Sequence, residues 1–133
     1  MKITNIPKRV NLPVAKLFEL TSNCKNIAQY FSNEVTDINA TEDSCTFTIE
    51  NFTQISLKIL DKKPFTFIRL EAENDKNIPL FIVLKFTEIS VNETEIVTEL
   101  DIDIPVFFKP VIEKSLQRFI DTFSEKIRIE VVK

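Results

Sequence analysis

The sequence predicts an α+β fold in the order β-α-α-β6-α, with an antiparallel sheet of seven strands and one long C-terminal helix. Three observations predict it. Two short apolar clusters with helical spacing follow Pro13. From Glu34 to Ile104 apolar residues recur at every second position, as in half-buried strands. The stretch IPVFFKPVIEKSLQRFIDTFSEKI, residues 104–127, then carries large apolar residues three or four positions apart, which is typical of an amphipathic helix.

The N-terminal elements are a strand and two short helices. Ile3 to Leu12 reads as a strand interrupted at Pro7, and we expect it at a sheet edge because proline cannot donate to a ladder. PVAKLFELTSN begins a helix at Pro13, where the missing N–H of proline costs nothing in the first turn. CKNIAQYF is a second short helix, with its apolar face formed by Ile27, Tyr30 and Phe31.

Six further strands are predicted after the helix pair. Each has an apolar and a polar face, and they span Val35–Thr41, Cys45–Glu50, Ile55–Leu60, Ile68–Glu73, Leu80–Phe86 and Ile96–Ile104. One apolar and one charged face is typical of an antiparallel sheet that is covered on one side only. Spacings of about ten residues with turn signals between them predict a meander.

The final helix is the only long one, so we expect it to cover the apolar face of the sheet. Pro105 and Pro110 frame its start, and Pro110 belongs in its first turn. Its predicted apolar stripe consists of Phe108, Ile112, Leu116, Phe119, Phe123 and Ile127. Charged and polar residues occupy the opposite side, which indicates a solvated face.

Composition limits the classes of function. The chain has 133 residues, which predicts one domain over 1–133. Its net charge of −3 and its sequence pI near 5.1 argue against nucleic-acid binding, which usually needs a basic patch. No apolar run has the length of a signal peptide or of a membrane span, so we expect a cytoplasmic protein without stable membrane insertion.

Two residue types are absent. Without histidine, the commonest general base and metal ligand is missing, and without glycine, Rossmann and P-loop phosphate sites are excluded. Turns then need other residues that tolerate left-handed backbone, and the asparagines between apolar runs are candidates: Asn51, Asn74, Asn77 and Asn92. Cys24 and Cys45 have no zinc or CxxC spacing, and we interpret both as small buried hydrophobic residues.

The order of elements resembles the helix-grip fold of the START-like, or SRPBCC, superfamily. In particular, it resembles short bacterial members labelled as polyketide cyclase or dehydrase-like. Three stretches carry the resemblance, which extends from about Ile3 to Ile127: VNLPVAKLFELTSNCKNIAQYF, ATEDSCTFTIENFTQISLKILDKKPFTFIRLEAE, and TEIVTELDIDIP with the following helix. The absence of turn glycines departs from the family. The resemblance implies a curved sheet wrapped around the helix, with an apolar tunnel between them.

The candidate pocket residues point inward from the sheet and the helices. They are Tyr30, Phe47, Leu57, Leu70, Ile82, Leu84, Thr98, Leu100, Ile112, Leu116 and Phe119. The alternative for each is packed core, since protein interiors fill to crystal-like density. The hydroxyls of Tyr30 and Thr98 would orient a ligand, or else hydrogen-bond within the protein.

No catalytic residue, metal site or cofactor site is predicted. Glu99, Asp101 and Asp103 share one face of a strand, and we interpret this face as the charged outside of the sheet, away from the tunnel. The carboxylates lack the glycine-containing loop of an EF-hand site. No triad or activated nucleophile is visible in the sequence.

Three functions stay open at this point. The first is a non-catalytic binding or carrier protein for an apolar small molecule, such as a lipid, a quinone or a polyketide-like compound, held between the sheet and the C-terminal helix. The second is a cyclase or dehydratase-type enzyme acting on an aromatic or polyketide substrate. The third is a protein-interaction module whose cavity is filled. The sequence leaves the oligomeric state open.

Overall fold

We describe a computed structural model of the protein, which covers residues 1–31, 35–49 and 53–131. Its strands are β1 Lys2–Thr4, β2 Lys8–Val10, β3 Val35–Ala40, β4 Ser44–Ile49, β5 Gln54–Lys63, β6 Phe67–Asn74, β7 Leu80–Ser90 and β8 Glu93–Ile102. Its helices are α1 Val14–Thr21, α2 Cys24–Ala28, the 3-10 turn η1 Val106–Phe108 and α3 Lys109–Glu130. This is the predicted α+β order of elements.

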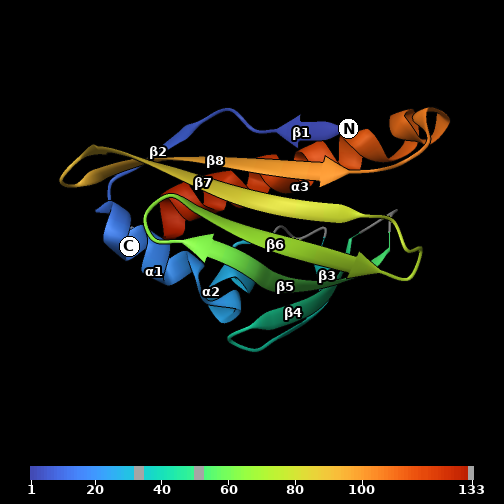
Figure 1. The fold of residues 1–133 in the computed structure, drawn as a ribbon, viewed down its shortest axis with the longest axis horizontal. Helices are drawn as coiled ribbons and strands as arrows, with labels where there is room; N and C mark the ends of the chain where they lie inside the picture. The colour runs from blue at the N-terminus through green and yellow to red at the C-terminus, as the bar shows by residue number, and fades with distance from the viewer. Residues whose placement is uncertain (32–34, 50–52, 132–133) are drawn as a thin grey trace.

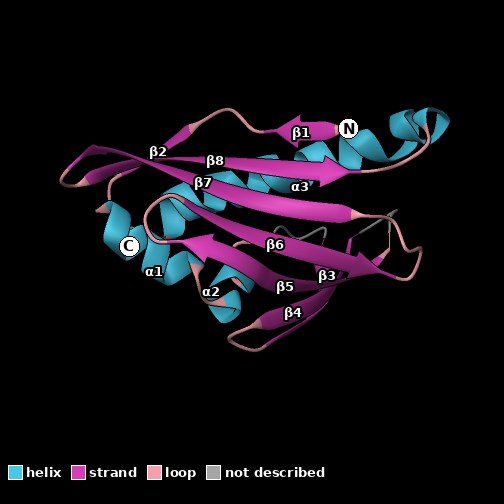
Figure 2. Ribbon diagram, in the orientation of Figure 1, coloured by secondary structure: helices cyan, strands magenta, loops and turns pink. Residues whose placement is uncertain are grey.

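The strands form one antiparallel sheet in the order β1-β8-β7-β6-β5-β4-β3 (Figures 1 and 2). The six strands from β3 to β8 pair with their sequence neighbours, which confirms the predicted meander. β1 and β2 both pair with β8, so the N-terminal segment lies at a sheet edge as predicted.

The predicted first strand is divided, and the sheet formed by the described residues therefore has eight strands where seven were expected. Between β1 and β2, Asn5 keeps the chain attached to β8. Its backbone N–H donates to the Thr98 carbonyl oxygen at 3.1 Å, and its side-chain Oδ1 accepts from the Thr98 N–H at 2.7 Å. The interruption falls just before Pro7, whose nitrogen has no hydrogen to donate to the ladder.

The first short helix begins one residue later than expected. Pro13, predicted in the first turn, is the N-cap of α1 and precedes that turn, and α1 buries Leu17 and Phe18. The side chain of Asn23 caps α2 by accepting a hydrogen bond from the Lys25 N–H at 2.9 Å. Both helices pack their apolar sides against the sheet, and α2 has a side-chain N-cap whereas α1 has none.

The long helix α3 lies along one face of the sheet, behind β7 and β8 in Figure 1. Pro110 lies in its first turn, as predicted. Five residues of the expected stripe are buried: Ile112, Leu116, Phe119, Phe123 and Ile127. Phe108 is different, because the α-helix begins one residue later and the Phe108 side chain is half exposed, at 47%. The prediction of a buried Phe108 was therefore wrong.

The left-handed turn positions are only partly those expected. Asn77 has φ of 54°, as predicted for a turn asparagine, whereas the other two left-handed residues are Asp37 and Phe65 among the residues that the structure describes. Asn74 instead stabilises the same β6–β7 turn with its side chain, and Asn92 has no positive φ. Asn51 lies outside the described residues.

Candidate functional site

The space between the sheet and the middle of α3 is filled by an aromatic cluster, which consists of Phe31, Phe47, Phe119 and Phe123. The Phe31 and Phe47 ring centroids are 4.4 Å apart, and the Phe47 and Phe119 centroids are 6.0 Å apart. Phe119 and Phe123 follow each other on α3 with their rings stacked at 6.1 Å. These separations lie within the range of direct aromatic contact, so the rings pack against one another.

A very small cavity remains beside the aromatic cluster. It has room for water-molecule centres of only about 10 Å³. Its walls are apolar, and they comprise Ile27, Phe31, Leu57, Leu70, Ile82, Leu84, Phe119 and Phe123. A buried water needs at least about 10–15 Å³ and two or more polar partners. This cavity is barely large enough for one water molecule, and its apolar walls disfavour even that one. The interior is packed core at this position.

All eleven candidate pocket residues are buried in the structure. Five of them line the residual cavity: Leu57, Leu70, Ile82, Leu84 and Phe119. Phe47 joins the aromatic cluster, and Leu100 and Leu116 belong to the same hydrophobic core. Ile112 alone among the eleven lines a different and larger space, at the beginning of α3.

The two predicted hydroxyl residues lie in the core. Thr98 is fully buried, and its Oγ1 is 2.8 Å from the Ser124 Oγ of α3, so that the two hydroxyls hydrogen-bond to each other across the sheet–helix interface. Tyr30 is buried, with its ring edge against Phe123 at 6.5 Å between centroids. The Thr98 hydroxyl thus has a protein partner in place of a ligand.

A wider cleft opens at the N-terminal end of α3. We call it the end cleft, and its lining residues are Lys76, Ile78, Ile104, Pro105, Phe108 and Ile112. Its volume is about 320 Å³. The β6–β7 turn forms one wall, and the segment between β8 and α3 together with the first turn of the helix forms the other. Five of the six lining residues are apolar, and Lys76 adds an ammonium group.

Apolar side chains also project from the protein beside the end cleft. Phe107, Phe108 and Val111 form what we call the apolar tip, with exposed fractions of 73%, 47% and 68%. The two phenylalanine rings touch, with centroids 4.3 Å apart. In Figure 1 this segment forms the coil beyond the end of β8, away from the main body of the sheet. Phe108 belongs to both the tip and the cleft.

Comparison with solved structures identifies the architecture. A conserved protein from Geobacillus kaustophilus has a TM-score of 0.73 at 12% identity, and the match covers 99% of this chain and 95% of that one. A START superfamily protein from Mycobacterium smegmatis matches with a TM-score of 0.73 at 10% identity, over 99% of both chains. The fold is START-like. CalU16 from Micromonospora echinospora matches with a TM-score of 0.61 at 14% identity, over 98% of this chain and 73% of that one.

These likenesses establish the START-like, helix-grip architecture that the sequence predicts, in which a sheet wraps around a long C-terminal helix. No family model matches the chain, and no curated protein matches it in sequence. None of the helices in the described part of the chain combines the length and hydropathy that crossing a bilayer requires.

The outer face of the START-like sheet carries charged residues paired across strands. Glu99, one of three aligned carboxylates, ion-pairs with Lys85 at 3.1 Å, which confirms its predicted outward direction. Lys58 contacts Glu73 at 2.8 Å and Glu71 at 3.7 Å. The hydrogen bond from the Lys58 ammonium lowers the pKa of Glu73. These exposed pairs place charge on the face opposite α3.

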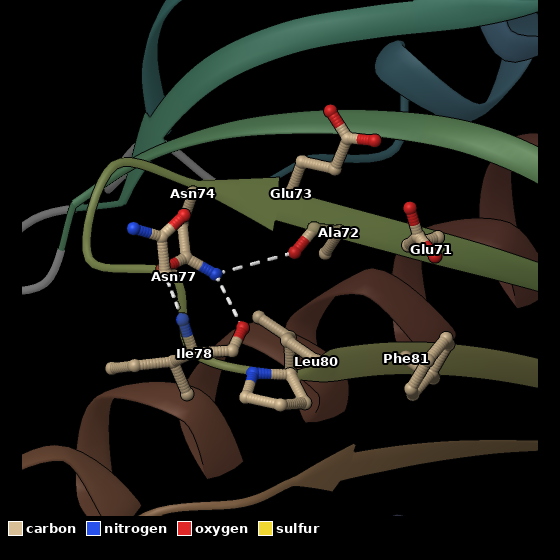
Figure 3. Close-up of a pocket in the computed structure, with 9 residues that line it drawn as sticks. Glu71, Ala72, Glu73, Asn74, Asn77, Ile78, Leu80 and Phe81 are labelled. Atoms are coloured by element: carbon tan, nitrogen blue, oxygen red, sulfur yellow. Dashed lines mark hydrogen bonds between the residues drawn. The ribbon is translucent and has the colours of Figure 1, made fainter.

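A hollow of about 330 Å³ with mixed polar and apolar lining lies at the β6–β7 turn, beside the charged face (Figure 3). Asn74 Nδ2 donates to the Ile78 carbonyl oxygen at 2.8 Å, and its Oδ1 accepts from the Ile78 N–H at 3.1 Å, which holds the turn. Glu71 and Glu73 border the hollow, and both already contact Lys58. The same turn contributes Ile78 to the end cleft, so the hydrogen bonds of Asn74 also position one wall of that cleft.

Sequence reasoning missed most of the end cleft. Ile78, Ile104 and Pro105 lie in connections between elements, where periodicity gives no signal. One sequence signal could have indicated the cleft. An isoleucine stands directly before a proline in two connections, at Ile78 and Ile104, and two such apolar residues outside helices and strands predict apolar surface that another part of the molecule or a ligand covers. The interior residues Ile27, Phe31 and Phe123 were recognised as apolar faces of helices but were not placed on the cavity.

Proposed function

We propose that this START-like domain, over residues 1–133, is a non-catalytic binding or carrier protein for an apolar small molecule of the lipid, quinone or polyketide-like kind. The ligand is held between the sheet and α3 at the end cleft. The observation that carries the proposal is the end cleft itself: about 320 Å³, with five apolar residues among its six lining residues. Ligand pockets typically measure about 300–1,000 Å³ and are mostly apolar.

Binding at this place is driven by removal of apolar surface from water. Ile78 and Ile104 are partly buried in the free protein, and Phe108 is half exposed, so a ligand can cover surface that the fold leaves uncovered. Burial of apolar surface stabilises a complex by roughly 25 cal/mol per Å² before the costs of association.

The end cleft is a better candidate than the middle of α3. A ligand in the middle would have to displace the aromatic cluster, because the residual cavity there has only about 10 Å³. Cores packed to this degree tolerate added volume poorly, at a typical cost of about 1–3 kcal/mol even for extra methylenes. We therefore place the ligand beside Ile112 at the end cleft, and not beside Phe47 and Phe119 in the middle of the interface. It still lies between the sheet and the helix.

The enzyme alternative has less support at this site. Cyclase or dehydratase chemistry needs a positioned acid or base, and the six residues lining the end cleft include no Asp, Glu, Tyr or Cys. The outward Glu99 lies in an ion pair with Lys85 on the opposite face of the sheet. A second candidate, a protein-interaction module, is favoured by the packed interior together with the apolar tip, because exposed apolar patches often mark partner sites.

Competition between ligands tests the proposal. A fluorescent anilinonaphthalene sulfonate probe is titrated into the protein and then displaced with dodecanoate. Ile78→Asp places a carboxylate in the end cleft and should weaken binding of both compounds by about tenfold or more, equivalent to about 1.4 kcal/mol. Val91→Asp is the matched control, since Val91 is an exposed apolar residue of the β7–β8 turn, and it should bind like the wild type.

Circular dichroism confirms that both variants are folded before binding is compared. Equal loss of affinity in both variants, or wild-type binding that Ile78→Asp leaves unchanged, would contradict binding in the end cleft. Native mass spectrometry of the purified wild-type protein separates the two candidate functions. A retained small molecule supports the binding protein, and failure of the wild type to bind either compound leaves the interaction module as the better account.

A further inference from the structure

An apolar projection and an apolar hollow lie side by side at the beginning of α3. The projection is the apolar tip, whose Phe107 and Val111 side chains are mostly exposed. The hollow is the end cleft, and Phe108 belongs to both, because its ring contacts the Phe107 ring and also lines the cleft. Single exposed apolar residues are ordinary on proteins, but a contiguous exposed group beside an apolar cleft indicates an interaction surface.

The tip and the cleft are complementary in shape. Phe107 and Val111 do not line the end cleft of their own chain, so the tip projects beside the cleft and leaves it open. The cleft of about 320 Å³ is large enough for an aromatic side chain, since pockets of about 300 Å³ already hold small ligands. An interface with two-fold symmetry uses such an arrangement, because each copy places its projection in the other copy's hollow and receives one in return.

Charged side chains of both signs flank the apolar tip. Asp103 follows β8, and Lys109 and Glu113 lie in the first turns of α3. Within the described part of the chain, none of these three side chains forms an ion pair or a hydrogen bond. A two-fold rotation sets this rim against itself, so a rim of one sign would repel its copy, whereas a rim of both signs can pair with it. An anionic bilayer would instead favour basic residues alone around the tip.

We propose that the apolar tip and the end cleft form a two-fold interface with a second copy of this chain, in which each copy's Phe107 enters the other copy's end cleft. The apolar side chains then lie at the centre of the interface and the charged ones at its rim, which is the usual anatomy of a protein–protein interface. Only the tip, the cleft and their rim take part, so the interface is small, and we expect a dissociation constant between about 1 µM and 1 mM. The protein is then a monomer when dilute and a dimer when concentrated.

Dimerisation of this kind controls access to the end cleft. Each copy's Phe107 occupies the space that we assign to the ligand in the other copy, so a ligand and a second copy compete for the same cleft. An apolar ligand therefore dissociates the dimer, and by linkage the dimer lowers the apparent affinity of the protein for the ligand. The competition rests on the proposed function, whereas dimerisation does not.

Sedimentation velocity of the full chain, at protein concentrations from about 1 µM to 1 mM, tests the interface. The wild type should shift from monomer to dimer over this range. Phe107→Asp should raise the dissociation constant about tenfold or more, because each copy would then bury a carboxylate in an apolar cleft. Val91→Asp, at an exposed apolar residue of the β7–β8 turn, is the matched control and should dimerise like the wild type. Circular dichroism checks that both variants are folded.

A second pair of variants tests the charged rim. Lys109→Glu makes the rim predominantly acidic, so that two copies repel each other, and should raise the dissociation constant by about 3–10-fold. Lys62→Glu makes the same change of charge near the end of β5, which lies at the other end of the sheet (Figure 1), and should leave the dimer unchanged. This pair keeps the test decisive if Phe107→Asp does not fold.

Dodecanoate separates the interface from the proposed function. Saturating dodecanoate should dissociate the wild-type dimer, and Phe107→Asp should bind dodecanoate at least as tightly as the wild type, because Phe107 does not line its own cleft. A dimer that binds no dodecanoate refutes the proposed function and leaves the interface standing. Dodecanoate binding to a protein that stays monomeric refutes the interface and leaves the proposed function standing.

Four outcomes would overturn the two-fold interface. The first is a wild type that stays monomeric up to about 1 mM, and the second is a dimer that Phe107→Asp and Val91→Asp affect equally. The third is a dimer of undiminished strength with dodecanoate bound, which would show that Phe107 does not occupy the cleft. The fourth is a monomer that floats with vesicles of phosphatidylcholine and phosphatidylserine and loses this binding in Phe107→Asp, which would assign the tip to a bilayer surface.

Discussion

The two ends of the sheet–helix interface differ in how completely they are packed. Around the middle of α3, four phenylalanine rings leave a void of about 10 Å³, whereas at its N-terminal end the end cleft has about 320 Å³. Phe119 and Phe108 illustrate the contrast, since they are the same residue type on one helical segment, one buried and one half exposed. In the described part of this START-like fold, side chains therefore fill the space at the middle of α3, whereas an open apolar cleft lies where the helix begins.

The largest expected effect is in the packed middle. Phe119→Ala removes a ring that contacts three other aromatic rings, so it should lower the free energy of unfolding by about 3–5 kcal/mol. Urea denaturation at neutral pH measures the change. A loss below about 2 kcal/mol would mean that Phe119 borders open space, and the distinction between the two ends would then disappear.

The next effect concerns the buried hydroxyl pair. Thr98→Val keeps the shape of the side chain but leaves the Ser124 hydroxyl without its 2.8 Å partner, which should cost about 1–3 kcal/mol. The double variant Thr98→Val with Ser124→Ala should cost less than the sum of the single variants, because no unpaired hydroxyl then remains. Strict additivity in the urea-unfolding cycle would show that the two hydroxyls do not interact.

Phe108→Ala provides the matched substitution at the open end. Because about half of this side chain is already in water, its removal should cost about 1 kcal/mol or less, well below the cost at Phe119. The same urea experiment compares the two directly. If Phe108→Ala destabilises as much as Phe119→Ala, the end cleft is packed in solution and is no binding site.

The smallest effect is at the C-terminal end of α3, where exposed charged groups add to the packing of Ile127. The Arg128 guanidinium, with Lys8 of β2 at 3.3 Å, lowers the pKa of Glu125 to about 2 from 4.5. A lowered carboxyl pKa stabilises the folded state above about pH 4.5, and this contribution disappears as the pH falls through about 2. Because the pair is exposed and screened, Glu125→Gln should cost below about 1 kcal/mol at pH 6.

An NMR titration of the Glu125 side-chain carboxyl carbon checks the pKa, and stability measured at pH 6 and pH 3 checks its consequence. Raised salt should reduce the difference between Glu125→Gln and the wild type. A carboxyl pKa near 4.5 in the folded protein would show that the contacts with Arg128 and Lys8 do not persist in solution.

The fold could be predicted from the sequence because each element has a strong period. β4, β6, β7 and β8 alternate between buried and more exposed residues over most of their length, and α3 has a stripe with helical spacing, so fold class and sheet partners follow largely from binary patterning. Pro7 indicated that the first strand would be interrupted, but not that the interruption would extend from Asn5 to Pro7. At Asn5 the side chain, rather than the strand backbone alone, accepts the hydrogen bond from the Thr98 N–H. Side-chain bridges of this kind have no periodic signature.

The candidate site could be predicted only in part. Patterning identifies which residues point inward, and all eleven candidates are indeed buried, but it does not say whether inward residues meet or leave a gap. That depends on ring volumes and on the distance between sheet and helix, which sequence period does not encode. The end cleft is built from Ile78, Ile104 and Pro105 in connections, where conformation depends on tertiary contacts and turn geometry.

The central claim is that an apolar ligand binds at the beginning of α3 and leaves the middle packed. Methyl NMR of isoleucine- and leucine-labelled protein titrated with dodecanoate tests it most directly. The account predicts the largest shifts at the methyl groups of Ile78, Ile104 and Ile112, with Leu57 and Leu84 nearly unchanged. Saturable binding with its largest shifts at Leu57 and Leu84 would contradict it, because the ligand would then occupy the space that the aromatic cluster fills.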